Sequence, residues 1–97
     1  MLCPKYLVTL LNSAHKVEKH LQDVYNLQAT SSRQSPEDGK VTIYYVNEKN
    51  NRSLIIEVSD EGVAGLVKDD EKKKIIGTSL EIESERDYLN LIDWFNK

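Results

Sequence analysis

His15 and His20 are the side chains of this sequence best suited to proton transfer or metal binding near neutral pH. They stand five residues apart in a segment that we interpret as one helix, and at about 100° per residue they point about 140° away from each other. A metal site on one helix needs two histidines four residues apart on the same face. Both side chains also lie off the apolar stripe of that helix. We therefore interpret them as solvated side chains and expect no metal site.

Cys3 is the only cysteine of the chain and its only candidate thiol nucleophile. It stands just before the first expected helix, and a helix N-terminus lowers a thiol pKa, but a nucleophile also needs a nearby base. We interpret Cys3 as an incidental residue near the chain end, with a catalytic role as the alternative. One cysteine allows no intrachain disulfide. Because small secreted domains usually depend on several disulfides, this count indicates a reducing, cytoplasmic location.

Three acidic clusters, at 37–38, 60–61 and 69–71, raise the question of a cation site. A calcium loop needs alternating oxygen ligands over about twelve residues, with a central glycine and a closing glutamate. The second cluster is followed by Gly62 and then by apolar residues, and the third adjoins several lysines, as a solvated turn does. Gly62 and Gly65 form neither a Walker loop nor a dinucleotide fingerprint. The sequence therefore predicts no catalytic residue, no metal and no cofactor.

Length and composition indicate a single soluble domain over residues 1–97. The chain is 39% hydrophobic and 30% charged, which is ordinary for a folded protein. Its net charge of −3 disfavours a nonspecific polyanion binder. No run approaches the ~20 apolar residues of a membrane span, so we expect no membrane partner.

Two helices are expected, one near each end of the chain. From Lys5 to Ala29, apolar residues recur at intervals of three and four, as on a helix with one buried stripe. The second helix begins at about Glu85, where Ser84 and Asp87 resemble a capping box. The polar residues 30–39, after the first helix, are typical of a loop. The buried stripe of the second helix comprises Tyr88, Leu91, Ile92 and Phe95.

Four strands are expected between the helices, because side chains alternate with a period of two over 41–46, 54–58, 63–67 and 74–82. A two-residue turn at 50–51 would place Tyr45 opposite Ile56 and keep apolar partners on one face. Short connections predict an antiparallel meander. The expected inward-facing residues of the last strand are Ile76, Thr78, Leu80 and Ile82.

The predicted fold is therefore α+β, with a four-stranded antiparallel meander sheet flanked by an N-terminal and a C-terminal helix, in the order α-β-β-β-β-α. We expect both helices to pack on one face of the sheet, which leaves the other face in water. Helices on opposite faces are the alternative, and they would bury both faces of the sheet.

Five apolar side chains are expected to lie outside the core of this fold, and they form the candidate interface. Tyr44, Val46 and Ile55 lie on the face of the sheet away from the expected core, and Leu89 and Trp94 flank the apolar stripe of the last helix. Exposed apolar patches that contain Tyr and Trp often mark surfaces that bind proteins. The structural alternative is a stabilising cross-strand pair between Tyr44 and Ile55, with Leu89 and Trp94 packed on the first helix or the sheet edge.

These observations favour a non-enzymatic protein-binding module: a small regulator, an inhibitor, an immunity-like or antitoxin-like protein, or a small subunit of a complex. Its partner would be another protein or a second copy of the chain, as a homodimer. A nucleic-acid-associated regulatory protein is the alternative, although Glu57, expected opposite Tyr44, would repel phosphate. A small enzyme is the second alternative, with a pocket around Glu18, His15 or Cys3.

Overall fold

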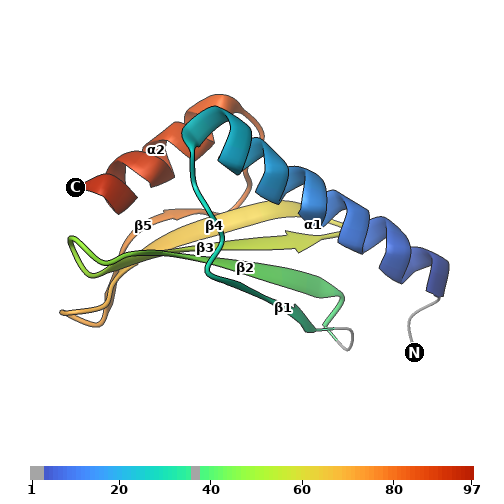
Figure 1. The fold of residues 1–97 in the computed structure, drawn as a ribbon. Coiled ribbons are helices and arrows are strands. Elements are labelled where there is room, and N and C mark those ends of the chain that lie inside the picture. The colour runs from blue at the N-terminus through green and yellow to red at the C-terminus, as the bar shows by residue number, and fades with distance from the viewer. Residues whose placement is uncertain (1–3, 36–37) are drawn as a thin grey trace.

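The computed structural model describes residues 4–35 and 38–97, and it has a helix near each end of the chain and a sheet between them (Figure 1). The predicted α+β class is confirmed, but the sheet has five strands rather than four. The helices are α1 (Pro4–Tyr25) and α2 (Glu85–Asn96), and the strands are β1 (Ser31–Ser35), β2 (Lys40–Asn47), β3 (Arg52–Ser59), β4 (Gly62–Asp69) and β5 (Lys74–Ser79).

The additional strand, β1, lies in the segment 30–39 that the sequence predicted to be a loop. It pairs antiparallel with β2, from Ser31 opposite Tyr44 to Ser35 opposite Lys40. Four of its five side chains are exposed, and none is apolar. An edge strand that buries neither of its faces needs no apolar alternation, so its sequence resembles that of a loop. The loop prediction was wrong for this reason.

The strands follow chain order across the sheet, and every neighbouring pair is antiparallel. The pairing of β2 with β3 differs from the predicted register, because Tyr45 lies opposite Leu54 and not opposite Ile56. The turn therefore spans residues 48–51, and Asn51 adopts a left-handed φ of 54° within it, which asparagine tolerates. Since the register shifts by an even number of residues, each side chain keeps its predicted face.

β5 departs from its predicted alternation because it contains a bulge at Ile76. An extra residue in a strand reverses the faces of the residues beyond it. Thr78 therefore pairs with β4 on the face away from the helices, and Leu80 lies beyond the strand and is exposed, whereas both were predicted to point inward. Ile76 and Ile82 do pack against the core, as predicted.

Both helices pack on the same face of the sheet, as predicted (Figure 1). α1 contacts β2 and β3, and α2 contacts β3, β4 and β5. The core between the two layers comprises Leu10, Ala14, Leu21, Val41, Ile43, Tyr45, Leu54, Ile56, Val58, Val67, Leu91, Ile92 and Phe95. We call the other side of the sheet the open face, and it carries Arg33, Lys40, Thr42, Tyr44, Val46, Ser53, Ile55, Glu57, Ala64, Leu66, Lys68, Ile75 and Thr78.

α1 ends at Tyr25 rather than at Ala29, because Asn26 adopts a left-handed φ of 57°. The Asn26 N–H donates to the Gln22 carbonyl at 3.0 Å, as in the capping motif that ends many helices. Leu27 and Ala29 lie beyond the helix but still pack against the core. The apolar pattern therefore continued past the helix end and gave a predicted helix that was too long.

α2 begins at Glu85, as predicted, and the Asp87 carboxylate caps it. This carboxylate accepts hydrogen bonds from the N–H groups of Glu83 at 2.9 Å and Ser84 at 3.2 Å. The two backbone donors hold the pKa of Asp87 below its usual value. The capping box predicted from Ser84 and Asp87 is therefore present at this helix start.

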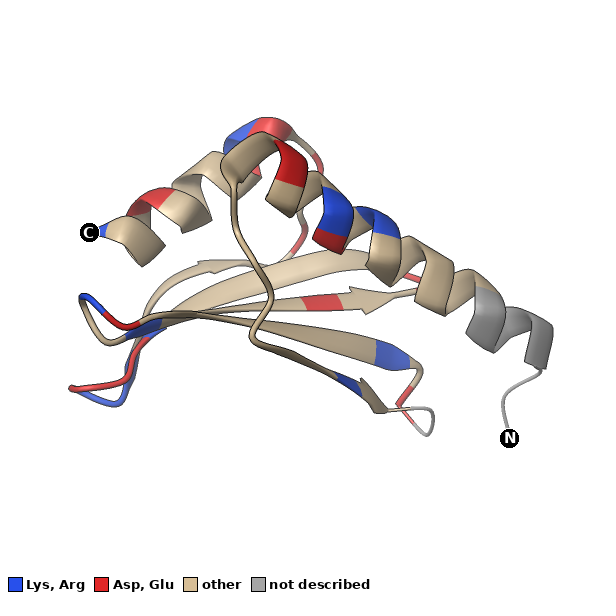
Figure 2. Ribbon diagram, in the orientation of Figure 1, with Lys and Arg blue, Asp and Glu red and all other residues tan. Residues whose placement is uncertain are grey.

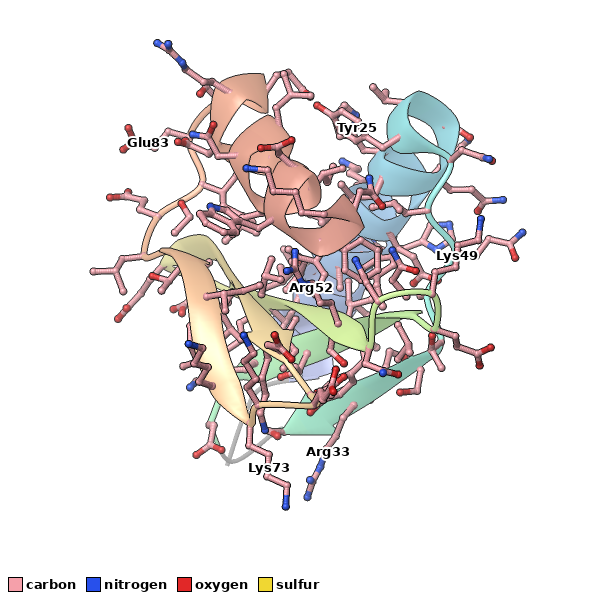
Figure 3. The ribbon with its side chains drawn as sticks, turned by 90° about the vertical axis from the view of Figure 1, so that its left-hand side faces the viewer. Tyr25, Arg33, Lys49, Arg52, Lys73 and Glu83 are labelled. Carbon is pink, nitrogen blue, oxygen red and sulfur yellow. The ribbon has the colours of Figure 1, made fainter. Side chains whose placement is uncertain are left out.

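The C-terminal end of α2 is held by the β2–β3 turn. The side-chain amides of Asn47 and Asn50 donate to the Phe95 carbonyl at 3.2 and 2.9 Å, and Arg52 Nη1 donates to the Trp94 carbonyl at 2.5 Å. Figure 3 shows Arg52 between the sheet and this end of the helix. The last carbonyls of a helix lack internal partners and carry partial negative charge, so these donors stabilise α2. The same contacts favour the four-residue turn over the predicted two-residue turn.

Gly65 of β4 lies against the helix layer, where a side chain would collide with the core. A Cβ atom at this position would lie 2.7 Å from Leu91 Cδ1 and 2.9 Å from Ile56 Cδ1. We expect Gly65→Ala to lower the free energy of unfolding by about 1–3 kcal/mol, measured by urea denaturation. The control is Ala64→Ser, on the open face, which should change this free energy by less than about 0.5 kcal/mol. Equal effects of both substitutions would contradict the close packing of α2 on β4.

Candidate functional site

An apolar row crosses the middle of the open face. Tyr44 of β2 pairs with Ile55 of β3, and Ile55 pairs with Leu66 of β4. All three side chains are half-buried, although neither helix lies on this side of the sheet. Val46, two residues further along β2, is 46% exposed. The structure therefore places the three predicted interface residues of the sheet together on one uncovered face, with Leu66 as a fourth member that the sequence analysis missed.

Charged side chains of both signs border this apolar row. Lys40 Nζ lies 4.0 Å from Glu57 Oε2 across the β2–β3 pair. The predicted register placed Glu57 opposite Tyr44, but Glu57 pairs with Thr42, two residue pairs further along the strands. Figure 2 shows that the strands are otherwise largely free of charge and that charge gathers in the turns and on the helices. The open face thus combines an apolar centre with a border of mixed charge.

The two predicted interface residues of α2 lie apart from the open face. Trp94 lies on Gly77 of β5, since a Cβ atom at Gly77 would be 2.9 Å from the indole Cδ1. The indole is nonetheless 41% exposed, and the Lys97 ammonium lies 4.9 Å from its ring centroid. Leu89 is also exposed. The five predicted residues therefore belong to at least two separate surfaces.

The two helices meet at a cluster that the sequence analysis did not find. Glu85, at the start of α2, accepts a hydrogen bond from the Tyr25 hydroxyl, and its other oxygen lies 2.6 Å from His20 Nε2. The rings of His20, Tyr25 and Tyr88 pack against one another with centroids 5.7–6.4 Å apart. We call these four residues the helix-junction cluster. His20 is therefore half-buried in a contact between helices, and its prediction as a solvated side chain was wrong.

Three tyrosine hydroxyls in and beside this cluster have raised pKa values. Partial burial, followed by the hydrogen bond to Glu85, raises the pKa of Tyr25 to about 12. Burial and the nearby charge of Glu18 raise the pKa of Tyr45, whose hydroxyl has no hydrogen-bond partner among the described residues. Burial and the charge of Glu85 raise the pKa of Tyr88. These higher pKa values lie further from neutral pH, where a group that catalyses proton transfer should titrate.

The residues named for a catalytic pocket do not come together. His15 is exposed and Glu18 is half-buried on α1, and Cys3 lies outside the described residues. A groove of about 980 Å³ lies elsewhere, between the α1–β1 connection and the β2–β3 turn, with amide side chains such as Asn26, Gln28 and Asn96 in its wall. Over residues 4–35 and 38–97, no group of three or more His, Cys, Asp or Glu side chains could hold a metal ion. In the same ranges, neither helix combines the length and hydropathy that crossing a membrane requires.

Comparison with known proteins returned no relative. No protein-family model, no curated protein and no solved structure matches the chain.

The hydroxyl of Tyr25 should lose its proton at a higher pH than a free tyrosine does, because the folded protein favours its neutral form. In a spectrophotometric titration of phenolate, the difference between the wild type and Tyr25→Phe should show a midpoint near pH 12. Glu85→Gln should lower that midpoint, because it removes the negative charge and the acceptor beside the hydroxyl. Since the folded pKa is the higher one, the contribution of Tyr25 to stability should be complete below pH ~10 and lost as the pH rises to 12.

The matched control for this titration is Glu83→Gln, which removes a nearby exposed carboxylate that is not bonded to Tyr25. It should leave the Tyr25 midpoint unchanged. A Tyr25 midpoint near pH 10 in the wild type would show that the contact between the helices does not form.

Proposed function

We propose that this chain is a non-enzymatic protein-binding module that docks its partner on the open face. The observation that carries this proposal is the apolar row of Tyr44, Ile55 and Leu66 across a sheet face that neither helix covers. Apolar patches on a water-exposed face are characteristic of surfaces that bind another protein, and tyrosine is a favoured anchor at such surfaces. The role fits a small regulator, an inhibitor or a small subunit of a complex in the cytoplasm.

The size of the open face supports a protein as the ligand. Strands of up to eight residues at about 3.3 Å per residue, in a sheet of five strands about 4.8 Å apart, form a face of about 24 by 26 Å. This is about 600 Å², close to the ~800 Å² that each partner buries in a standard protein interface. A surface of this extent suits a sheet or a helix pair of the partner more than it suits a small molecule, which needs a concave site.

The charges of the open face favour a protein over a nucleic acid. Arg33, Lys40 and Lys68 share this face with Glu57, and Lys40 lies 4.0 Å from the Glu57 carboxylate. A polyanion would meet this carboxylate, whereas a protein surface can present both signs of charge. The three cations on the same face as Tyr44 nevertheless support a nucleic-acid-associated regulator as the second candidate, because cations and a stacking ring are the elements of a single-strand-binding sheet.

A pair of charge substitutions on the open face should abolish partner binding. Proteins crosslinked to the wild type in cells are identified, purified and titrated by calorimetry against the wild type and against Tyr44→Glu with Ile55→Glu. We expect the double variant to bind at least about 100-fold more weakly, because two central anchors become charged. The control, Leu11→Glu with Val24→Glu, places the same charges on exposed apolar positions of α1 and should stay within about threefold of the wild type.

Circular dichroism and thermal melting establish that each variant is folded. Equal affinity of a purified partner for the wild type and the open-face variant would contradict docking on this face. Binding of a single-stranded oligonucleotide that the open-face variant loses, with no protein partner, would favour the second candidate.

A further inference from the structure

β5 leaves one side of the sheet without a partner strand. It pairs with β4 alone, and in the described part of the chain no strand pairs with its other side. The chain stays beside β4 after the strand ends, since the Ile82 N–H donates to the Val63 carbonyl at 2.7 Å. The free edge therefore runs from Lys74 to Ile82, along the strand at the left of Figure 3. Unpaired backbone donors and acceptors on such an edge are a template for another strand.

The two edges of the sheet carry different side chains. β1, at the other edge, is short and wholly polar, with Arg33 at its centre, and these features protect an edge from pairing. On the β5 edge, Ile75 is 56% exposed and Leu80 is 92% exposed. Apolar side chains beside an unpaired backbone make β5 the edge suited to association.

Opposite charges flank the two ends of the β5 edge. Lys72–Lys74 precede or begin the strand, and Glu81 and Glu83 follow it. Figure 3 shows Lys73 at one end of the strand and Glu83 toward the other. All five side chains are exposed, and within the described residues none of them forms an ion pair at 4.0 Å or less. The edge therefore has a basic end and an acidic end whose charges are available to a partner.

We propose that two copies of this chain associate through their β5 strands, paired antiparallel about a two-fold axis, so that two five-stranded sheets become one continuous sheet. Antiparallel pairing places Lys72–Lys74 of each copy beside Glu81 and Glu83 of the second copy, and the symmetry forms this contact twice. A parallel arrangement would place like charges side by side. A second copy fits this edge because the same chain supplies both the lysines that precede β5 and the glutamates that follow it.

Trp94 lies at the same seam. Its indole packs on Gly77 of β5 and remains 41% exposed, so a strand added to β5 would lie near the indole. Trp94 is also the only tryptophan of the chain, so its fluorescence reports on this contact alone. Each copy has one free β5 edge, and association through a two-fold axis therefore stops at two copies. The inference does not rest on the proposed function, because pairing at β5 leaves the open face uncovered.

Charge reversal at the two ends of the edge tests this arrangement. Sedimentation equilibrium of the wild type from about 5 to 500 µM should show a monomer–dimer equilibrium, weakened at least about tenfold between ~50 and ~500 mM salt. Lys72→Glu with Lys73→Glu, and separately Glu81→Lys with Glu83→Lys, should each raise the dissociation constant at least about 30-fold. An equimolar mixture of the two variants should form a heterodimer, with Trp94 emission shifted to shorter wavelength.

Lys16→Glu with Lys19→Glu is the matched control, because it reverses two exposed lysines of α1 and should leave the wild-type dimer intact. Circular dichroism establishes that all variants fold. A wild type that remains monomeric throughout, a dimer that both edge variants keep, or a mixture that fails to associate would each overturn the proposal. A dimer lost instead in Tyr44→Glu with Ile55→Glu would place the contact on the open face and would overturn it as well. None of these results depends on whether another protein binds the open face.

Discussion

The apolar face of β2, β3 and β4 has to be removed from water, and one helix does not cover it. α1 covers β2 and β3, and α2 covers β3 to β5, so elements from opposite ends of the chain must lie on the same side. Because α1 and α2 pack on the same side of the sheet, Glu85 contacts His20 and Tyr25 at the helix-junction cluster. It also leaves the opposite side of the sheet without cover, because the described chain has no third helix. The open face is thus a direct result of how the core is closed.

The faces of the strands could be predicted from the sequence better than their pairing. Tyr45 and Ile56 are buried as predicted although the register between their strands was wrong by two residues, since an even shift changes no face. The bulge at Ile76 has the opposite effect, and it turned Thr78 away from the core. β1 could not be predicted, because an edge strand that buries no side chain carries no apolar period.

The candidate site could likewise be predicted from the sequence only in part. Tyr44, Val46 and Ile55 could be placed on one face from their positions in two strands, because their relation depends on a period of two. The contact of Tyr25 with Glu85 spans 60 residues and depends on how the helices cross, which no local pattern records. The two proposed surfaces are also compatible with each other. Two copies joined at β5 would carry their open faces on the same side of one sheet, and a partner with repeated sites would meet both at once.

The contact between the β2–β3 turn and the end of α2 bears on the rates of folding and unfolding. Every strand pair of the meander joins neighbours in the chain, so the sheet can assemble through short loop closures. The donors of the turn reach α2 across 42 to 48 residues, which are the longer closures and the later ones. Contacts that form after the folding transition state slow unfolding without accelerating folding. We therefore expect the hydrogen bonds of Asn47, Asn50 and Arg52 to slow unfolding more than they accelerate folding.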